Sequence, residues 1–147
     1  QDYDRAEELI NESLNVAREL ELGSHLTLCL TYSAYNDMDL DKLDSAMTKL
    51  SEATGILQQS ETKVFVVEVL LTYAHLLFAQ ESYPGSLLLC EFILMHQTVE
   101  DVTNQLILQP LHKQLMALVP DGDQQQIQQQ SQALDVDGAM KLIQANV

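Results

Sequence analysis

The side chains that could do chemistry in this chain are few and widely separated. Its four histidines are His25, His75, His96 and His112, and none has a His, Cys, Asp or Glu partner at a spacing typical of a metal site. The sequence holds no Gly-rich phosphate loop, no C-x-x-C pair and no G-x-S-x-G motif. We therefore expect no enzymatic activity, no metal and no other cofactor.

One polar stripe interrupts the most apolar segment, Val64–Ala79. Glu68, Thr72 and His75 are spaced so that a helix would place all three on one face. Glu68 and His75 lie two helical turns apart, which is too far for direct contact. A His in such a stripe is more often a structural group than a functional one, so the stripe indicates either a packing surface or one wall of a groove.

The rest of Val64–Ala79 is apolar on every side, which is typical of a helix buried by several neighbours. The segment is shorter than the roughly 18–20 residues that a membrane span needs, and it has Glu68 and His75 near its middle. We therefore expect it to be the central helix of an all-α protein with no membrane association.

Composition sets the broad class of the protein. At 147 residues and 46% apolar content, one globular domain is expected, and abundant Leu, Ala, Gln and Glu favour helix. A net charge of −15 repels nucleic acid, so we expect no direct nucleic-acid binding. The acidity indicates solubility or, as the less common alternative, a basic partner.

Compartment and context follow from the cysteines and the first residues. Cys29 and Cys90 lie in apolar helical runs, as buried free thiols do in a reducing cytoplasm. The chain shows no signal peptide, begins with Gln and starts inside a helical pattern. We expect a cytoplasmic segment of a longer protein.

Apolar periodicity and breaker residues predict the remaining helices. We expect helices over residues 2–22, 24–36, 40–58, 64–79, 84–96, 98–119 and 136–146, with a solvated helix in the Gln-rich tract around Ile127. Gly23 is expected to end the first helix, and Ser24, Asp39 and Asp135 to cap later ones. Pro110 is expected to kink or split its helix.

Three break points look alike, at residues 1–6, 38–43 and 81–86. Each has a capping side chain, then a large apolar residue, then a small or apolar residue three positions later. The intervals of about 40 residues each hold two predicted helices, which is typical of an α-solenoid.

These break points resemble the Gly-Asp-Tyr-x-x-Ala turn of tetratricopeptide repeats. Residues 2–6 fit it, whereas Met38 and Glu81 replace the Gly and Leu43 and Ser86 replace the Ala. The resemblance implies a solenoid of seven or eight helices in antiparallel pairs. Residues 1–97 would form the pairs, the first incomplete, and residues 98–147 a C-terminal helical cap on the same domain. Whether 98–147 form a cap or a further repeat stays open, with Pro110 and the Gln tract favouring a cap.

Long repeats of this kind resemble the C-terminal sensor regions of large bacterial signalling and transcriptional regulators, and the tail over residues 132–140 resembles their endings. That resemblance implies an NTPase module before the repeats and an attached DNA-binding domain or kinase.

The tetratricopeptide register implies that the first helix of each pair lines a concave groove. The groove residues it selects are His25, Leu28, Tyr32, Tyr35, Asn36, Glu68, Leu71, His75 and Phe78. Such a surface would bind a protein or peptide segment, or a small effector. The alternative is a purely structural spacer or an oligomerisation module, with a possible homodimer through the N-terminal helix.

Overall fold

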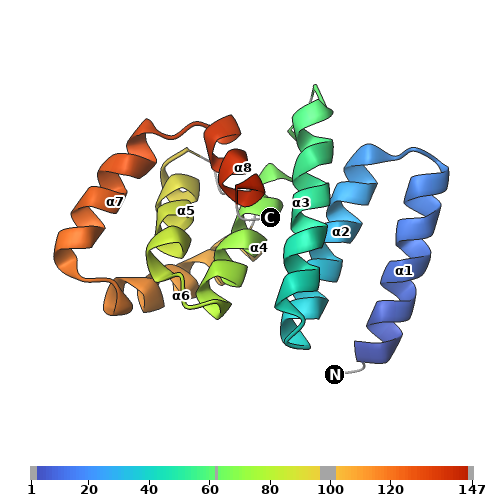
Figure 1. Cartoon of the computed structure of the whole chain (residues 1–147), viewed down its shortest axis with the longest axis horizontal. Coiled ribbons are helices and arrows are strands. Elements are labelled where there is room, and N and C mark those ends of the chain that lie inside the picture. The colour runs from blue at the N-terminus through green and yellow to red at the C-terminus, as the bar shows by residue number, and fades with distance from the viewer. Residues whose placement is uncertain (1–2, 62, 97–101, 146–147) are drawn as a thin grey trace.

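The computed structural model describes residues 3–61, 63–96 and 102–145. These residues form eight α-helices and no β-strand, so the predicted all-α class is confirmed (Figure 1). The helices are α1 (Tyr3–Glu19), α2 (Gly23–Asp39), α3 (Leu43–Gln59), α4 (Val66–Ala79), α5 (Tyr83–His96), α6 (Val102–Leu118), α7 (Asp121–Ala133) and α8 (Val136–Gln144).

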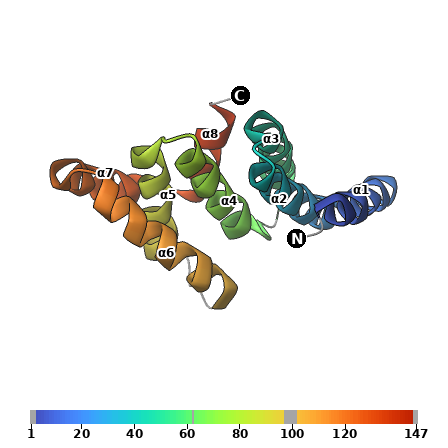
Figure 2. The ribbon, with the colours of Figure 1, turned by 90° about the horizontal axis from the view of Figure 1, so that it is seen from below.

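The helices follow one another along the long axis of the molecule, with α1 at one end and α6 and α7 at the other (Figures 1 and 2). Helices next to each other in the chain pack together from α1 to α6. Contacts also join α2 to α4, α4 to α6 and α5 to α7, while α8 returns to the middle and packs on α3 and α4. None of the described helices is both long enough and apolar enough to cross a membrane.

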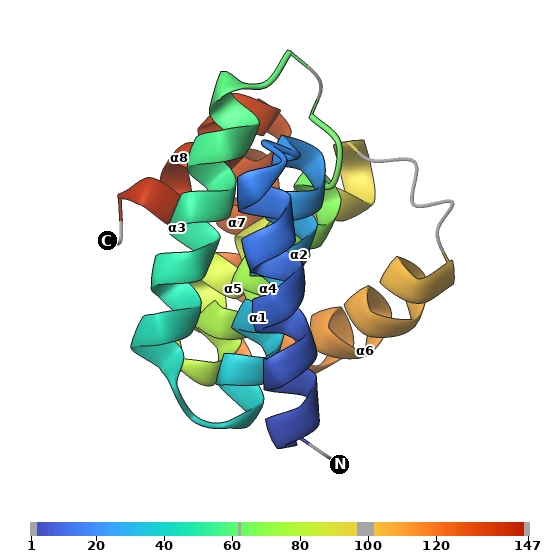
Figure 3. The ribbon, with the colours of Figure 1, turned by 90° about the vertical axis from the view of Figure 1, so that its right-hand side faces the viewer.

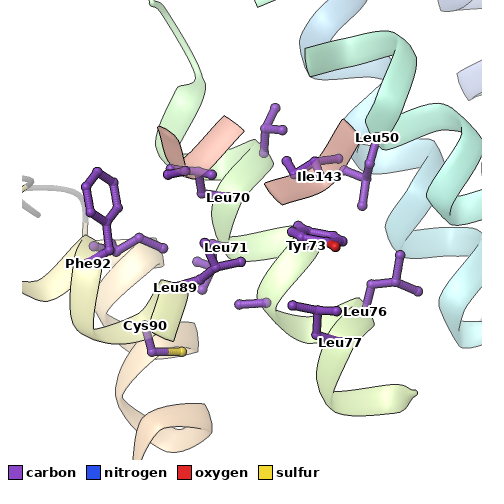
Figure 4. Close-up of a cluster of buried hydrophobic side chains, with 14 of the residues drawn as sticks. Leu50, Leu70, Leu71, Tyr73, Leu76, Leu77, Leu89, Cys90, Phe92 and Ile143 are labelled. Atoms are coloured by element: carbon purple, nitrogen blue, oxygen red, sulfur yellow. The ribbon is translucent and has the colours of Figure 1, made fainter. Parts of the chain in front are cut away.

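Helix α4 occupies the centre, as its apolar sequence predicted. Val69, Leu70, Tyr73, Ala74 and Leu76 have no exposed surface. Figure 4 shows the reason, since α5 packs on one side of α4 while α3 and α8 pack on the other. Each large apolar side chain buried there contributes about 1.5–3 kcal/mol of transfer free energy.

Helix α8 is tied to this core by apolar and polar contacts. Its residues Ala139, Met140 and Ile143 are fully buried. Tyr73 Oη on α4 donates a hydrogen bond to the Leu142 carbonyl at 3.2 Å. The predicted cap at Asp135 is confirmed, because its side chain accepts a hydrogen bond from the Gly138 amide.

Three interhelical turns share one backbone geometry. Glu21, Asp41 and Glu81 have φ values of 53°, 59° and 60°, and each follows the end of a helix. In each turn the next residue's amide bonds back to a carbonyl five positions earlier, as in a Schellman motif. The prediction that Gly23 ends the first helix is therefore wrong, because the left-handed residue is Glu21 and Gly23 begins α2.

The predicted end of the second helix at residue 36 and start of the third at residue 40 are also wrong. Helix α2 continues to Asp39 and α3 begins only at Leu43, so Asp39 does not cap α3. The Asp37 side chain is buried and paired with Lys49 of α3. Asp is common in turns, but here it lies within α2 and faces α3. Ser24 likewise provides no cap, since α2 starts without a side-chain cap hydrogen bond.

The C-terminal third matches its predictions more closely. Of the two outcomes predicted for Pro110, the split is wrong, because α6 runs through it from Val102 to Leu118. The alternative, a kink, stays a prediction. The Gln-rich tract is helical in α7, and Ile127 is the buried anchor that the sequence suggested. The predicted starts of the first and sixth helices and the end of the last lie partly outside the described residues.

Candidate functional site

The polar stripe of α4 turns toward α2. Thr72 is buried, and its hydroxyl donates to the Glu68 carbonyl at 2.7 Å, so it serves its own helix. His75, about one turn after Thr72, reaches across to Tyr35 of α2. The predicted groove residues of α2 and those of α4 are therefore in contact through Tyr35 and His75.

Tyr35 and His75 form an aromatic contact in which both polar tips are left unpaired. The ring centroids are 5.8 Å apart and the planes are tilted by 55°, a usual geometry for such a pair. Tyr35 Oη and His75 Nε2 are buried, and neither has a hydrogen-bond partner among the described residues. The Thr72 hydroxyl lies near Tyr35 but outside hydrogen-bond geometry. Each unpartnered group costs about 1–3 kcal/mol.

Burial also fixes the protonation of this pair. It raises the pKa of Tyr35 to about 12, an effect that the nearby Thr72 hydroxyl reduces and the charge of Asp39 increases. Burial lowers the pKa of His75 below 6.5. Both side chains are therefore neutral at pH 7, and each retains capacity to donate or accept a hydrogen bond.

Tyr32 is the accessible residue beside this contact. It lies one turn before Tyr35 on α2 and is 55% exposed. Glu68 is half-buried and lies on the same α4 stripe as His75. We call the surface that carries Tyr32, Tyr35, Glu68 and His75 the α2–α4 face.

Other predicted groove residues lie in different settings. His25 is exposed near the start of α2, while Leu28 and Asn36 are half-buried on that helix. Leu71 is only 2% exposed and lies beside Leu89 of α5 (Figure 4).

Phe78 is turned toward α5 as well. Its ring packs on Tyr83, with 5.5 Å between centroids. Leu71 and Phe78 thus belong to the contact between α4 and α5, whereas His75 belongs to the contact between α4 and α2.

Two partly buried polar contacts between helices could not be predicted from the sequence. Lys49 Nζ pairs with the buried carboxylate of Asp37, joining α3 to α2. His112 Nε2 lies 2.8 Å from Glu91 Oε1, joining α6 to α5. Partners so far apart in sequence cannot be matched until the helix packing is known. Within the described parts of the chain, no group of three or more His, Cys, Asp or Glu side chains could hold a metal ion.

A small pocket of about 200 Å³ lies elsewhere, between the start of α2 and the end of α3. Its lining residues are Gly23, Ser24, Thr27, Ile56, Leu57 and Ser60. The Thr27 hydroxyl donates to the Gly23 carbonyl at 3.0 Å, so it is already satisfied within α2. None of the predicted groove residues lines this pocket.

Comparisons with models of protein families, with curated proteins and with solved structures found no match to this chain.

Proposed function

We propose that this protein is a non-enzymatic interaction domain that binds a segment of a partner protein on its α2–α4 face. The observation that supports this proposal is the Tyr35–His75 contact, where two helices bring together two neutral polar groups that lack partners among the described residues. Native proteins usually satisfy buried polar groups, and those left unsatisfied call for an explanation. A ligand that supplies the missing hydrogen bonds is the explanation we favour.

The helix arrangement supports a recognition role. Helix α2 contacts α4, α4 contacts α6, and α5 contacts α7. Contacts between every second helix are typical of stacked helix pairs. We infer an α-solenoid similar to tetratricopeptide repeats, in which the row of α2, α4 and α6 forms the recognition surface. A regulatory role within a larger protein would use the same surface.

Binding on this face would involve a side-chain rearrangement. Tyr35 Oη and His75 Nε2 are inaccessible in the unbound protein, so a ligand can reach them only when the side chains rotate outward. Tyr32 needs no such movement, because it is already exposed and offers a flat apolar ring with a hydroxyl group. The ligand would therefore first contact Tyr32 and then select the rotated state of Tyr35 and His75.

A displayed library of random dodecapeptides, selected against the intact chain, tests this proposal. Affinities of the selected peptides would be measured by calorimetry for the wild type, Tyr32→Ala and a Tyr35→Phe/His75→Phe double variant. The expected result is a loss of affinity of about tenfold or more in both variants. Tyr83→Phe is the matched control, since it removes a hydroxyl from α5, and it should leave affinity unchanged.

Peptides that bind all four proteins equally would place recognition on another surface. If no peptide is selected but a small metabolite stabilises the wild type alone, the ligand class would change from a protein segment to a small effector. Failure of both searches would favour a purely structural spacer.

A further inference from the structure

The outer surface of α1 carries a strip of apolar side chains. Leu9, Val16 and Leu20 are 49%, 47% and 62% exposed. Their spacing places all three along one line on the helix. Single exposed apolar residues are normal on any protein, whereas several aligned along one helix can mark a contact surface. The exposed side chains of Glu12 and Ser13 separate Leu9 from Val16. We call these three residues the α1 strip.

Helix α1 lies at one end of the molecule and packs mainly on α2, with an ion pair from Arg18 to Glu52 of α3. Leu14 and Ala17 are buried, and Ile10 is partly buried against the core, on the side that meets α2. Figure 3 looks onto this end, and no other described helix lies in front of α1. Among the described residues, no helix covers the strip (Figure 3).

The charges beside the strip select the kind of partner. Glu8, Glu12 and Glu19 are exposed on the side of α1 next to the strip. Arg5 on the same side pairs with Glu8 at 3.8 Å, which leaves Glu12 and Glu19 to set a negative charge beside the strip. Arg18, on another side of the helix, is already engaged with Glu52 at 2.9 Å. In a homodimer formed through this strip, the carboxylates of one copy would face those of the other. Each copy also carries a net charge of −15. Like charges facing each other oppose such a contact, whereas Lys and Arg would favour it.

We propose that the α1 strip docks an amphipathic helix of a partner protein, one whose apolar stripe is flanked by Lys and Arg. Helical partners present apolar anchors at helical spacing, which matches the line formed by Leu9, Val16 and Leu20. This docking surface is separate from the α2–α4 face, so either proposal can fail without the other.

The test uses three labelled peptides of about three heptads each. The first has Leu at positions a and d with Lys and Arg at e and g. The second has the same composition in a scrambled order that destroys the stripe, and the third replaces Lys and Arg with Glu. Binding to the intact chain is followed by fluorescence anisotropy at low and high salt.

The matched protein variants are Val16→Ser/Leu20→Ser on the strip and Leu106→Ser on α6, where Leu106 is 71% exposed. Because these side chains are exposed, all variants should keep the wild-type circular dichroism. We expect the striped basic peptide to bind the wild type and Leu106→Ser equally. The strip variant should bind at least about tenfold more weakly, and added salt should weaken binding to the wild type.

Four outcomes would overturn the proposal. They are equal binding of the scrambled peptide, equal binding of the acidic peptide, unchanged affinity in the strip variant, and no binding at all. Sedimentation of the unliganded protein gives a further check. A dimer that the strip variant cannot form would show that the occupant is a second copy instead.

Discussion

The rings of Tyr35 on α2 and His75 on α4 pack with their centroids 5.8 Å apart, while Tyr35 Oη and His75 Nε2 stay buried without partners among the described residues. The ring contact stabilises the pairing of α2 with α4 by about 0.5–1.5 kcal/mol. Each of the two unpaired atoms opposes it by about 1–3 kcal/mol. Removing only the polar atoms should separate these two effects.

The first prediction concerns the Tyr35 hydroxyl. Tyr35→Phe keeps the ring and removes a buried group that has no partner. We expect the free energy of unfolding to stay the same or rise by about 1 kcal/mol. Urea denaturation with a linear extrapolation measures this directly.

Tyr73→Phe is the control for that experiment. The Tyr73 hydroxyl donates to the Leu142 carbonyl and helps to hold α8, so its removal should cost about 1 kcal/mol. If Tyr35→Phe costs as much as Tyr73→Phe, the Tyr35 hydroxyl has a partner in solution and does not need one from a ligand on the α2–α4 face.

The second prediction concerns the effect of His75 on stability at acid pH. Burial lowers the pKa of His75 in the folded protein below the 6.5 of an exposed imidazole. Above pH 6.5 the ring is neutral in both states and its titration does not affect stability. As the pH falls below 6.5, the unfolded chain takes up a proton that the folded protein resists, so stability falls until the folded pKa is reached.

The measurement is the free energy of unfolding between pH 7.5 and pH 5.5 for the wild type and His75→Phe. The variant should lose less stability over this range than the wild type. His25→Gln is the control, because His25 is exposed on α2 and its replacement should leave the wild-type profile unchanged. Parallel profiles for the wild type and His75→Phe would show that His75 is not buried in solution.

The third prediction concerns the effect of Cys90 on stability at alkaline pH. Burial, with a smaller effect from the charge of Glu91, raises the pKa of the Cys90 thiol from 9.0 to about 12. Above pH 9 the unfolded chain loses a proton that the folded protein keeps, so stability should fall as the pH rises from about 9 to about 12. The full loss is on the order of 4 kcal/mol. Unfolding at pH 8 and pH 10.5 should show a smaller decrease in Cys90→Ala than in the wild type or in Cys29→Ala.

Periodicity was sufficient to predict the helices. The apolar segment around Leu70 could be placed at the centre because no other position would bury a helix on every side. The helix ends were less predictable. Glu21 and Asp41 adopt left-handed backbone that sequence reasoning assigns to Gly or Asn, so the turns were placed one to three residues away from where they lie.

The site could be predicted only in part, and for a physical reason. Spacing along α4 put Glu68 and His75 on one stripe, and the structure brings His75 to Tyr35 of α2. Spacing does not determine how far a helix is rotated against its neighbours. Leu71 and Phe78 therefore looked equivalent to His75 in sequence, yet they lie against α5.

The fourth prediction concerns the ion pair between α2 and α3. The Asp37 side chain is 3% exposed and that of its partner Lys49 is 25% exposed. Lys49→Met leaves a buried carboxylate without its cation and should cost about 3–5 kcal/mol. The double variant Asp37→Leu/Lys49→Met removes both charges and should be more stable than Lys49→Met alone.

Arg18→Met provides the comparison, because Arg18 and Glu52 form an exposed pair. Its loss should cost at most about 1 kcal/mol. Equal costs for Arg18→Met and Lys49→Met in urea denaturation would mean that water reaches Asp37.

The fifth prediction concerns the turn between α4 and α5. Glu81 has φ 60°, and the Ser82 amide next to it bonds to the Leu77 carbonyl at 2.8 Å, so the turn depends on this backbone state. A side chain in left-handed backbone costs roughly 1–2 kcal/mol, whereas Gly adopts it freely but loses more entropy on folding. We expect Glu81→Gly to raise the free energy of unfolding by about 0.5–1 kcal/mol.

Glu81→Ala separates the backbone effect from the charge effect. The carboxylate follows the C-terminus of α4, where the helix dipole disfavours negative charge, so its removal alone should give a small gain. If backbone strain dominates, Glu81→Gly will be more stable than Glu81→Ala, and Asp41→Gly will exceed Asp41→Ala in the same way. Equal gains for Gly and Ala at both positions would assign the effect to charge and would show that these turns carry no strain.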